Sequence, residues 1–515
     1  SAKKPLSLAF AIPDHPWVDA SDGAAVRIAM TVGTAGNQPG SLLTSIKETD
    51  TNTDEIKVDF HYQSGKLFAD LKASVDLSNI KSLRSNGLVS SRGMIPHGEG
   101  FLVDYDIGNK LDHGELIRQY RNGRDVTSRP RGVYVLDTYG LEEADLMGSF
   151  PETWQWLRER VKPERDQNKD KAIREKWWLF ARSRPEIRDG ISGISKYVAT
   201  VQTCKHRFFV YLESDVVPDD KLIGIALENS KYFGVLSSRL HMYWALVTGG
   251  RLGVGNDPVY NKSLCIEAYP FPDLSGPEKE KLATRIGQLA EQIDQHRKTQ
   301  QAAHDKLTLT DIYNVLEKLR KQEPLNAKEK TIYDDGLVGI LRELHDELDR
   351  AVFDAYDWKD LADKLVGLPG ATTPYPEKSE AQAEAEEELL KRLVALNHQR
   401  ATEEAKGQIR WLRPEYQDPN YGKDSVSVGG STSQIEADVA LATTAAKAKK
   451  RTWPKVMLEQ IVSVKEALKT GHHTAEAITT LYKSPNTTLP KIQEALESLE
   501  SLGLISKTGD QYQIQ

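Results

Sequence analysis

The chain has 515 residues, of which 39% are hydrophobic and 28% are charged, and its formal net charge is −7. The length predicts three or four domains, and the negative charge excludes a globally basic nucleic-acid-binding protein, so evidence for such a partner has to be local. Apolar runs are shorter than the roughly 18 residues of a membrane helix, and no signal peptide is recognised. Two cysteines, Cys204 and Cys265, without a CxxC pair or nearby histidine ligands, predict a reduced, cytoplasmic protein without a metal site.

The first predicted element spans Leu6 to Gly33, LSLAFAIPDHPWVDASDGAAVRIAMTVG. Two β-prone apolar runs flank a turn rich in Pro, Asp, Ser and Gly, which indicates a long hairpin. Because a lone hairpin cannot bury itself, we expect it to belong to a sheet that the chain does not otherwise contain. Residues 55–145 follow with short alternating runs, such as KVDFHYQ and GVYVLDTYG, and predict a β-rich region.

The pattern is helical and rich in Trp and Arg from residue 151 to about residue 188. Strands return with KYVATVQT, HRFFVYLES and KLIGIAL, and a helical run, KYFGVLSSRLHMYWALVTG, leads to AYPFPD, whose prolines end the region. The chain is then helical to about Trp358, and a further acidic helix ends before Pro414. Residues 418–450 have the composition of a linker.

The last 65 residues predict a small separate unit. Three short helices, at about 455–468, 473–483 and 487–502, precede two strands around a GD turn, which is the winged-helix order. The third helix carries Glu494, Glu497 and Glu500 against Lys491, a charge that repels phosphates. Two functions stay open for this unit, docking to a protein and contact with DNA.

The stretch WALVTGGRLGVGNDPVYN, residues 244–261, contains two fragments that resemble motifs of methyltransferases. GGRLGVG could be a cofactor loop, and DPVY could be a degenerate Pro-Pro loop that holds a flipped base. Those two motifs belong to different strands of one sheet, so their adjacency here argues against both. We instead expect the glycines to let the backbone approach DNA closely.

Positive charge is concentrated between Lys171 and Lys262, where 14 Lys and Arg face nine Asp and Glu, a net charge of +5 against −12 for the rest. Basic residues alternate with aromatic ones in EKWWLFARSR, TCKHRFF and SSRLHMYW, a pattern that suits a surface contacting phosphates and bases. We expect Trp177 and Trp178 to belong to the core. The residues predicted to contact the DNA backbone are Arg92, Arg121, Arg124, Arg129, Lys205, His206, Arg207, Arg239, His241 and Lys262.

Many blocks, in order, resemble large bacterial DNA adenine-N6 methyltransferases of the MmeI-like group. FAIPDHPWVDASDGAAVRIAMTVG resembles the last strand pair of their methyltransferase domain. YRNGRD, FPETWQWLRERVKPERDQN, KWWLFARSRPEIRDGI, KYVATVQTCKHRFFVYL and the segment from GVLSSRLHMYW to AYPFPD resemble their target-recognition domain. IDQHRKTQQAAHDKLTLTDIYNVLEKLR, LHDELDRAVFDAYDW and IRWLRPEYQ resemble their C-terminal helical part. The resemblance covers roughly residues 7–420.

The resemblance implies a mixed α+β, multidomain protein. We expect the last strands of a Rossmann-like methyltransferase domain at residues 1–40, an α/β target-recognition domain at 41–275, a helical domain at 276–420, a linker at 421–450 and a winged-helix-like module at 451–515. Within the target-recognition domain, the side chains expected to read base edges are Arg251, Asn256, Asp257 and Asn261.

The resemblance also implies a function, the DNA-recognition portion of an S-adenosylmethionine-dependent adenine-N6 methyltransferase of a bacterial restriction-modification or phage-defence system. The sequence lacks the cofactor loop and the NPPY-type motif, so we expect no catalytic residue and no activity in this chain alone. S-adenosylmethionine would bind to a catalytic half, in the same longer polypeptide or in a separate subunit, with Pro13 and Trp17 walling the target-base pocket. The expected partners are double-stranded DNA, that catalytic half and, through the C-terminal module, other defence proteins, with no membrane involved. The alternative is a non-catalytic DNA-binding specificity or scaffold subunit of a defence complex.

Overall fold

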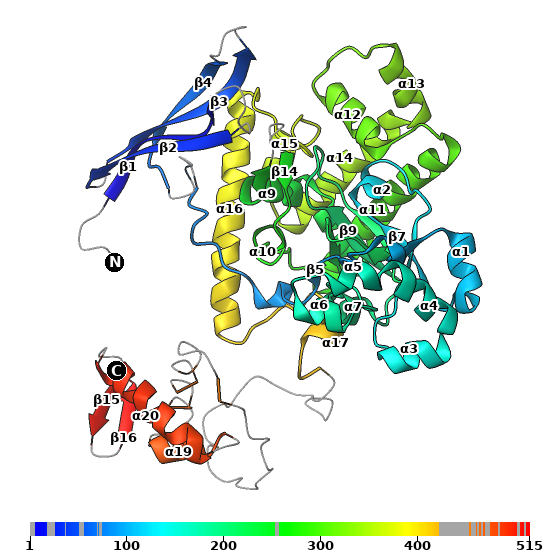
Figure 1. The fold of residues 1–515 in the computed structure, drawn as a ribbon. Helices are drawn as coiled ribbons and strands as arrows, with labels where there is room; N and C mark the ends of the chain where they lie inside the picture. Colours follow the sequence, from blue (N-terminus) through cyan, green and yellow to red (C-terminus); the bar gives the residue numbers. More distant parts are fainter. Residues whose placement is uncertain are drawn as a thin grey trace. The chain divides into compact units, whose positions relative to one another are not determined.

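The computed structural model describes residues 6–17, 26–36, 38–50, 56–68, 71, 75–252 and 257–421, and in the last part of the chain residues 453–454, 460, 463–464, 467–468, 474–482, 485–501, 505–508 and 511–514. The chain forms two compact units, Ser1–Val426 and Ser427–Gln515. Both units mix helices and strands (Figure 1). In the described part of the chain, none of the helices combines the length and the hydrophobicity that a membrane span requires.

The predicted N-terminal hairpin is confirmed, but its sheet is made by this chain. Strands β1 (Leu6–Trp17) and β2 (Val26–Ala35) are antiparallel, and β1 pairs in parallel with β3 (Gly40–Asp50), which is antiparallel to β4 (Ile56–Gly65). The expectation of a sheet without further strands from this chain is therefore wrong. The strand order is β2-β1-β3-β4, so the sheet continues past the predicted boundary at residue 40.

Two further sheets form the centre of the first unit. One has the order β10-β9-β12-β5 and is antiparallel throughout, and its strands are Val210–Glu213, Lys196–Val201, Leu222–Ile225 and Ser90–Arg92. The other has the order β11-β7-β8-β6, with strands Val217–Pro218, Ile117–Arg121, Tyr134–Leu136 and Leu102–Val103. The β-rich prediction for residues 55–145 is confirmed in part, because short helices α1 (Tyr105–Lys110), α2 (Gly123–Thr127) and α3 (Glu143–Ser149) lie between these strands.

The predicted Trp- and Arg-rich helical region forms α4 (Pro151–Arg160), α5 (Lys162–Asp166), α6 (Lys171–Glu175) and α7 (Pro185–Ile191). After the central strands follow α8 (Ser230–Leu236), α9 (Arg239–Thr248), the hairpin of β13 (Gly250–Leu252) and β14 (Asp257–Val259), and α10 (Lys262–Cys265). Trp177 and Trp178 are buried, as predicted. Each indole is largely shielded from water, and such large apolar side chains dominate core energetics.

The C-terminal half of this unit is helical, as predicted. Its helices are α11 (Pro277–Ala303), α12 (Leu309–Arg320), α13 (Ala327–Asp335), α14 (Val338–Ala355), α15 (Lys359–Leu365), α16 (Glu380–Ala405) and α17 (Pro414–Gln417). Helix α16 holds the segment before β5, because the Asn397 amide exchanges hydrogen bonds with the backbone of Lys81 and the Glu404 carboxylate accepts the N–H groups of Arg84 and Ser85. One hydrophobic cluster runs from Val75 to Leu412, so the central sheets and these helices share a core.

The second unit contains α19 (Ala475–Thr479), α20 (Pro485–Ser501) and a hairpin of β15 (Ile505–Thr508) and β16 (Gln511–Ile514). Its own core includes Ile478, Ile492, Leu496 and Tyr512. The order of helices followed by a hairpin agrees with the predicted elements, and the winged-helix assignment stays a prediction. Of the residues with linker composition, residues 418–421 are described, and the remainder of the predicted linker lies outside the described residues.

Candidate nucleic-acid interface

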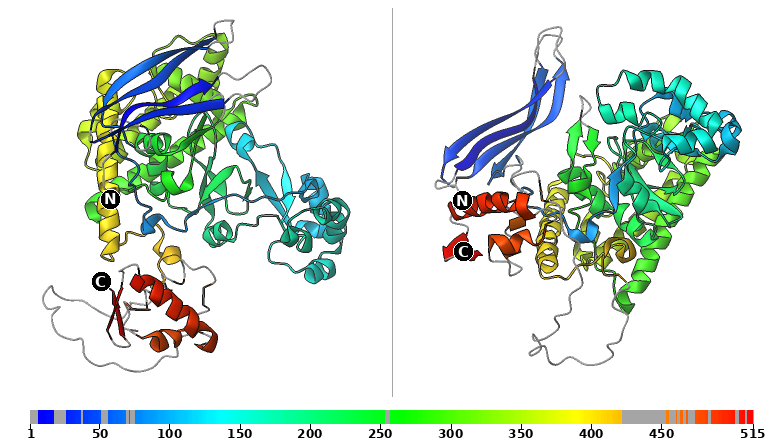
Figure 2. Two further views of the ribbon diagram at one scale, coloured as in Figure 1. Left: turned by 60° about the vertical axis from the view of Figure 1, so that its left-hand side comes forward. Right: turned by 60° about the horizontal axis from the view of Figure 1, so that its bottom comes forward.

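The stretch that contains the predicted base-reading residues forms a helix and a small hairpin. Strands β13 and β14 pair antiparallel directly after α9, and they stand out from the helices around them (Figure 2, right). Arg251 is exposed on β13, and Asp257 is half-buried at the start of β14. Asn256 lies outside the described residues. Burial by neighbouring residues lowers the pKa of the Arg251 guanidinium, and Asp14 opposes this shift.

Glycine is required just before β13, because the backbone there lies very close to the backbone at the end of β14. A Cβ atom added at Gly249 would lie 2.3 Å from the carbonyl oxygen of Val259. Asn261 serves the local fold as well, because its Oδ1 accepts the N–H of Ser263 at 3.0 Å and caps α10. The described part of GGRLGVG, residues 249–252, follows a helix and forms the first strand of an antiparallel hairpin, so it does not have the strand–loop–helix arrangement that a nucleotide-cofactor loop needs.

The prediction that Lys205, His206 and Arg207 share a surface is wrong for two of the three. Lys205 is exposed and donates to Asn314 Oδ1 at 2.6 Å. His206 is 2% exposed and lies between Thr372 Oγ1 and Asn314 Oδ1, each at 3.0 Å, and burial lowers its pKa to about 4. A neutral, enclosed imidazole of this kind is not available to a phosphate.

Arg207 joins two strands from the inside of the molecule. It is 1% exposed, and its guanidinium donates to Thr200 Oγ1 at 3.0 Å, to the carbonyl oxygen of Val201, and to that of Pro258 at 3.1 Å. Its donors therefore bind backbone oxygens of β9 and β14. Buried polar groups need such hydrogen-bond partners, so Arg207 has a structural role inside the molecule.

Arg239 and His241, both predicted to contact the DNA backbone, are also interior residues. Arg239 is 1% exposed and pairs with Glu386 at 3.1 Å, while it also donates to the carbonyl oxygens of Leu368 and Pro369. His241 is fully buried, its Nε2 lies 3.0 Å from Tyr260 Oη, and burial lowers its pKa to about 3. The prediction is wrong for both, because α9 is buried on several sides and its polar side chains find partners inside the chain.

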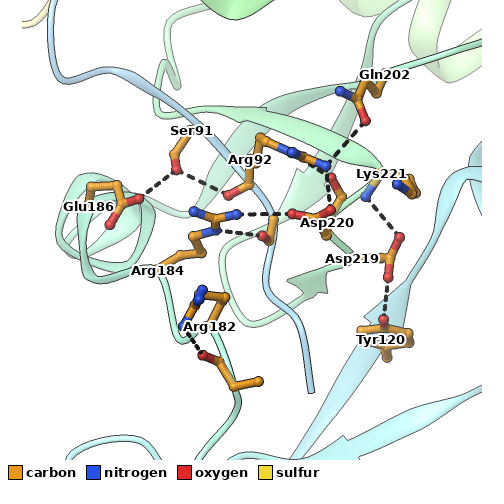
Figure 3. Close-up of polar contacts among 12 residues, drawn as sticks. Ser91, Arg92, Tyr120, Arg182, Arg184, Glu186, Gln202, Asp219, Asp220 and Lys221 are labelled. Carbon is orange, nitrogen blue, oxygen red and sulfur yellow. Dashed lines mark hydrogen bonds and ion pairs between the residues drawn. The ribbon is translucent and has the colours of Figure 1, made fainter. Parts of the chain in front are cut away.

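The structure brings together a different set of residues, which we call the arginine cluster. It consists of Arg92, Arg182, Arg184, Gln202, Asp220 and Lys221 (Figure 3). These side chains come from β5, from the turn before α7, from the end of β9 and from the turn between β11 and β12. Of the predicted backbone contacts, the cluster contains Arg92. The sequence does not predict the other members as contacts, although Arg182 and Arg184 belong to the basic and aromatic stretch EKWWLFARSR.

One carboxylate organises the arginine cluster. Asp220 pairs with Nη2 of Arg92 and, at 3.0 Å, with Nη2 of Arg184. Arg92 also donates to Gln202 Oε1 at 3.4 Å, and Arg184 donates through Nε to the carbonyl oxygen of Gly93 at 3.2 Å. Two guanidinium groups are thus fixed in orientation while they share a single negative charge. The planar donor geometry of each group matches the paired acceptor atoms of a phosphate or a base edge.

Further positive charge around the cluster has no acidic partner. Arg182 and Lys221 are exposed, and neither forms an ion pair with any described residue. Arg124, in the first turn of α2, is likewise exposed and without an ion pair in the described ranges. The backbone of Arg121 is joined to this region, because its carbonyl oxygen accepts the N–H of Asp219 at 2.8 Å. Asp219 and Glu186 lie beside these residues as well (Figure 3), so the surface carries a small excess of cations, the sign that a nucleic-acid interface needs.

The remaining predicted residues lie elsewhere. Arg129 donates to the carbonyl oxygen of His304 at 2.9 Å and pairs with Asp305, so it contacts the helical part of the unit. Lys262 pairs with Glu267. Pro13 is half-buried in β1 and Trp17 is the last residue of that strand. No group of three or more His, Cys, Asp or Glu with metal-binding geometry occurs among the described residues.

Comparison with known proteins defines the class of this domain. Residues 115–273 match the family model described as MmeI, target recognition domain, so the chain contains an MmeI-like target-recognition portion. The match ends near the predicted boundary at 275 and begins well after the predicted start at 41. No curated protein matches the chain.

The fold is similar to the solved structure of the Type IIL restriction-modification enzyme MmeI in complex with DNA, with a TM-score of 0.53 and 16% sequence identity. The similarity covers 77% of this chain and 46% of that chain, so this chain matches less than half of the MmeI length. At this identity the likeness is one of fold.

Proposed function

We propose that this chain is the DNA-recognition portion of a site-specific, S-adenosylmethionine-dependent DNA adenine-N6 methyltransferase in a bacterial restriction-modification or phage-defence system. The observation that carries the proposal is that most of the arginine cluster lies within the segment that matches the target-recognition family. Residues 115–273, which match the MmeI target-recognition family, contain Arg182, Arg184, Gln202, Asp220 and Lys221 of the arginine cluster.

The cluster supports binding of duplex DNA through its charge. Phosphate contacts fix the register of a protein on DNA, whereas contacts to base edges specify sequence. Arg182 and Lys221 have the exposure and the unpaired charge for phosphates. Arg92 and Arg184, held by Asp220, have the fixed orientation that a bidentate contact to a guanine needs. Arg251 on the β13–β14 hairpin, which the sequence predicts to read a base edge, is proposed to do so.

The N-terminal sheet supports a catalytic half as partner. Its hydrophobic cluster comprises Ala11, Leu42 and Leu67, with Leu8 and Leu71 packed against it. That is a small core for four strands of 10 to 12 residues, and a sheet of this size is stabilised by packing one face on another element. We propose that the catalytic half packs here and binds S-adenosylmethionine, with Pro13 and Trp17 beside the target adenine.

Methylome sequencing of the host, with and without the gene, tests this function. The proposal predicts one short sequence whose adenine is N6-methylated in the presence of the gene and unmodified after its deletion. A methylome that is the same in both strains contradicts methylation. Purified chain by itself is expected to transfer no methyl group to DNA.

A second candidate, a non-catalytic specificity or scaffold subunit of a defence complex, is favoured by the C-terminal unit. Helix α20 exposes Glu494, Glu497 and Glu500 on its surface, and this acidic face suits a protein partner better than phosphates. Sequence-specific DNA binding together with an unchanged methylome would select this candidate.

A further inference from the structure

A fully buried arginine near the cluster lacks partners for most of its donors. Arg165, in α5, is 0% exposed. Its Nη2 donates to the carbonyl oxygens of Pro96 at 2.6 Å and Leu179 at 3.2 Å. Its Nε and Nη1 have no hydrogen-bond partner, no described carboxylate forms an ion pair with it, and its Cζ lies 5.6 Å from the centre of the Phe101 ring. Buried charged groups are normally paired or fully hydrogen-bonded, so this arrangement requires an explanation.

Arg165 is one of the residues that line a cavity of about 370 Å³, with its Nε and Nη1 atoms shielded from solvent. The other cations of the wall are Lys176, Arg182 and Arg184, and the sole carboxylate in the wall, Glu186, accepts a hydrogen bond from Ser91 at 3.2 Å. Four cations thus face one carboxylate. Lys176 and Arg182 are exposed and lack ion-pair partners among the described residues, so their charge is available to a ligand.

The ionisation of Arg165 is compatible with anion binding at neutral pH. Burial lowers its pKa to about 10, and the nearby Glu164 opposes this shift. The side chain therefore remains cationic near pH 7. Apolar walls from Ile173, Phe180 and Pro185 reduce the local polarity and strengthen the attraction between the cations and an anion.

We propose that this cavity, which we call the Arg165 cavity, binds a phosphoryl group. A phosphate offers several acceptor oxygens, enough for Lys176 and Arg182 at once, and the buried charge of Arg165 adds electrostatic attraction. The phosphate has two sources of the same chemistry, a backbone phosphate of bound DNA or a free phosphate-bearing molecule. The first source rests on the function proposed above, since Arg182 and Arg184 belong to both the cavity and the arginine cluster.

Titration of the purified full chain with inorganic phosphate tests the proposal, with chloride at equal ionic strength as the reference. Binding is measured by calorimetry and by the melting temperature. We expect saturable binding in the wild type and at least a threefold weaker affinity in Lys176→Gln and in Arg182→Gln. Arg165→Gln should also weaken binding if it folds, and the other two variants decide the matter if it does not. Lys171→Gln, on the short helix α6 that ends just before Lys176 but outside the cavity wall, is the matched control and should bind as the wild type does.

Competition with a DNA duplex then identifies the source. Displacement of phosphate by the duplex assigns the cavity to a DNA phosphate, and simultaneous binding of both assigns it to a free molecule. Absence of phosphate binding over chloride overturns the proposal, as does equal binding by the wild type and the cavity variants. Phosphate binding by a chain that does not bind DNA would retain the cavity and reject the proposed function.

Discussion

Two exposed cations near Asp220 are expected to supply much of the electrostatic contribution to DNA affinity. Arg182 and Lys221 have no ion-pair partner within the described ranges, so each is expected to release counterions when a phosphate binds. We predict that Arg182→Gln and Lys221→Gln weaken binding to all duplexes alike and reduce the salt slope of log K by about 1 each. Fluorescence anisotropy over a series of salt concentrations measures both effects. Lys328→Gln, exposed on α13, is the control, and an unchanged slope in the cluster variants would contradict the assignment.

Two single residues, the buried histidines His206 and His241, make the stability of the fold sensitive to acid. Burial lowers the pKa of His206 to about 4 and of His241 to about 3, below the ordinary value of 6.5. As the pH falls below 6.5, the unfolded chain takes up protons that the folded chain does not, so stability is lost. Each histidine accounts for about 2 kcal/mol between pH 6.5 and pH 5.

We therefore predict that His241→Gln flattens the pH dependence of the free energy of unfolding, measured by urea denaturation from pH 7 to pH 5. Tyr260→Phe removes the hydrogen-bond partner of His241 and keeps the imidazole. This control should lower stability at every pH and leave the slope as steep as in the wild type. Equal slopes in His241→Gln and the wild type would show that burial of His241 is not the cause.

The elements that carry the cluster are held together by close backbone contact at the end of β5. A Cβ atom added at Gly93 would lie 2.2 Å from the carbonyl oxygen of Asp219 and 2.4 Å from that of Pro218. Gly93→Ala should push β5 away from the β11–β12 turn, which holds Asp220, and cost about 1–3 kcal/mol of stability. DNA affinity should fall with it. Gly148→Ala, in open space on α3, is the control and should be neutral or stabilising. Wild-type affinity in Gly93→Ala would contradict this role of the backbone contact.

The local periodicity of apolar residues predicted most helices and strands. It did not predict the contacts between segments that are distant in the sequence. The hairpin of β1 and β2, the helices after residue 276 and the buried Trp177 and Trp178 follow from apolar patterns. The interior positions of Arg207 and Arg239 do not, because their partners Pro258 and Glu386 lie 51 and 147 residues away. Similarly, Arg92 meets Asp220 across 128 residues, so single-sequence reasoning found isolated basic stretches and missed the cluster that they form.

At the scale of the whole molecule, one hydrophobic core joins the central sheets to the long helices. The domain that matches the MmeI target-recognition family thus shares its core with these helices. A net charge of −7 on the chain coexists with a local excess of cations on this domain. That contrast favours a protein that binds DNA at one surface and leaves the rest of its surface to solvent or protein partners.

Selection of duplexes from a random library by the purified full chain tests the central claim most directly. Site-specific recognition predicts that a single short sequence is enriched, and that it binds about 10³-fold or more tightly than a scrambled duplex at physiological salt. Enrichment of no sequence, or equal affinity for the selected and the scrambled duplex, would contradict a DNA-recognition function for this chain.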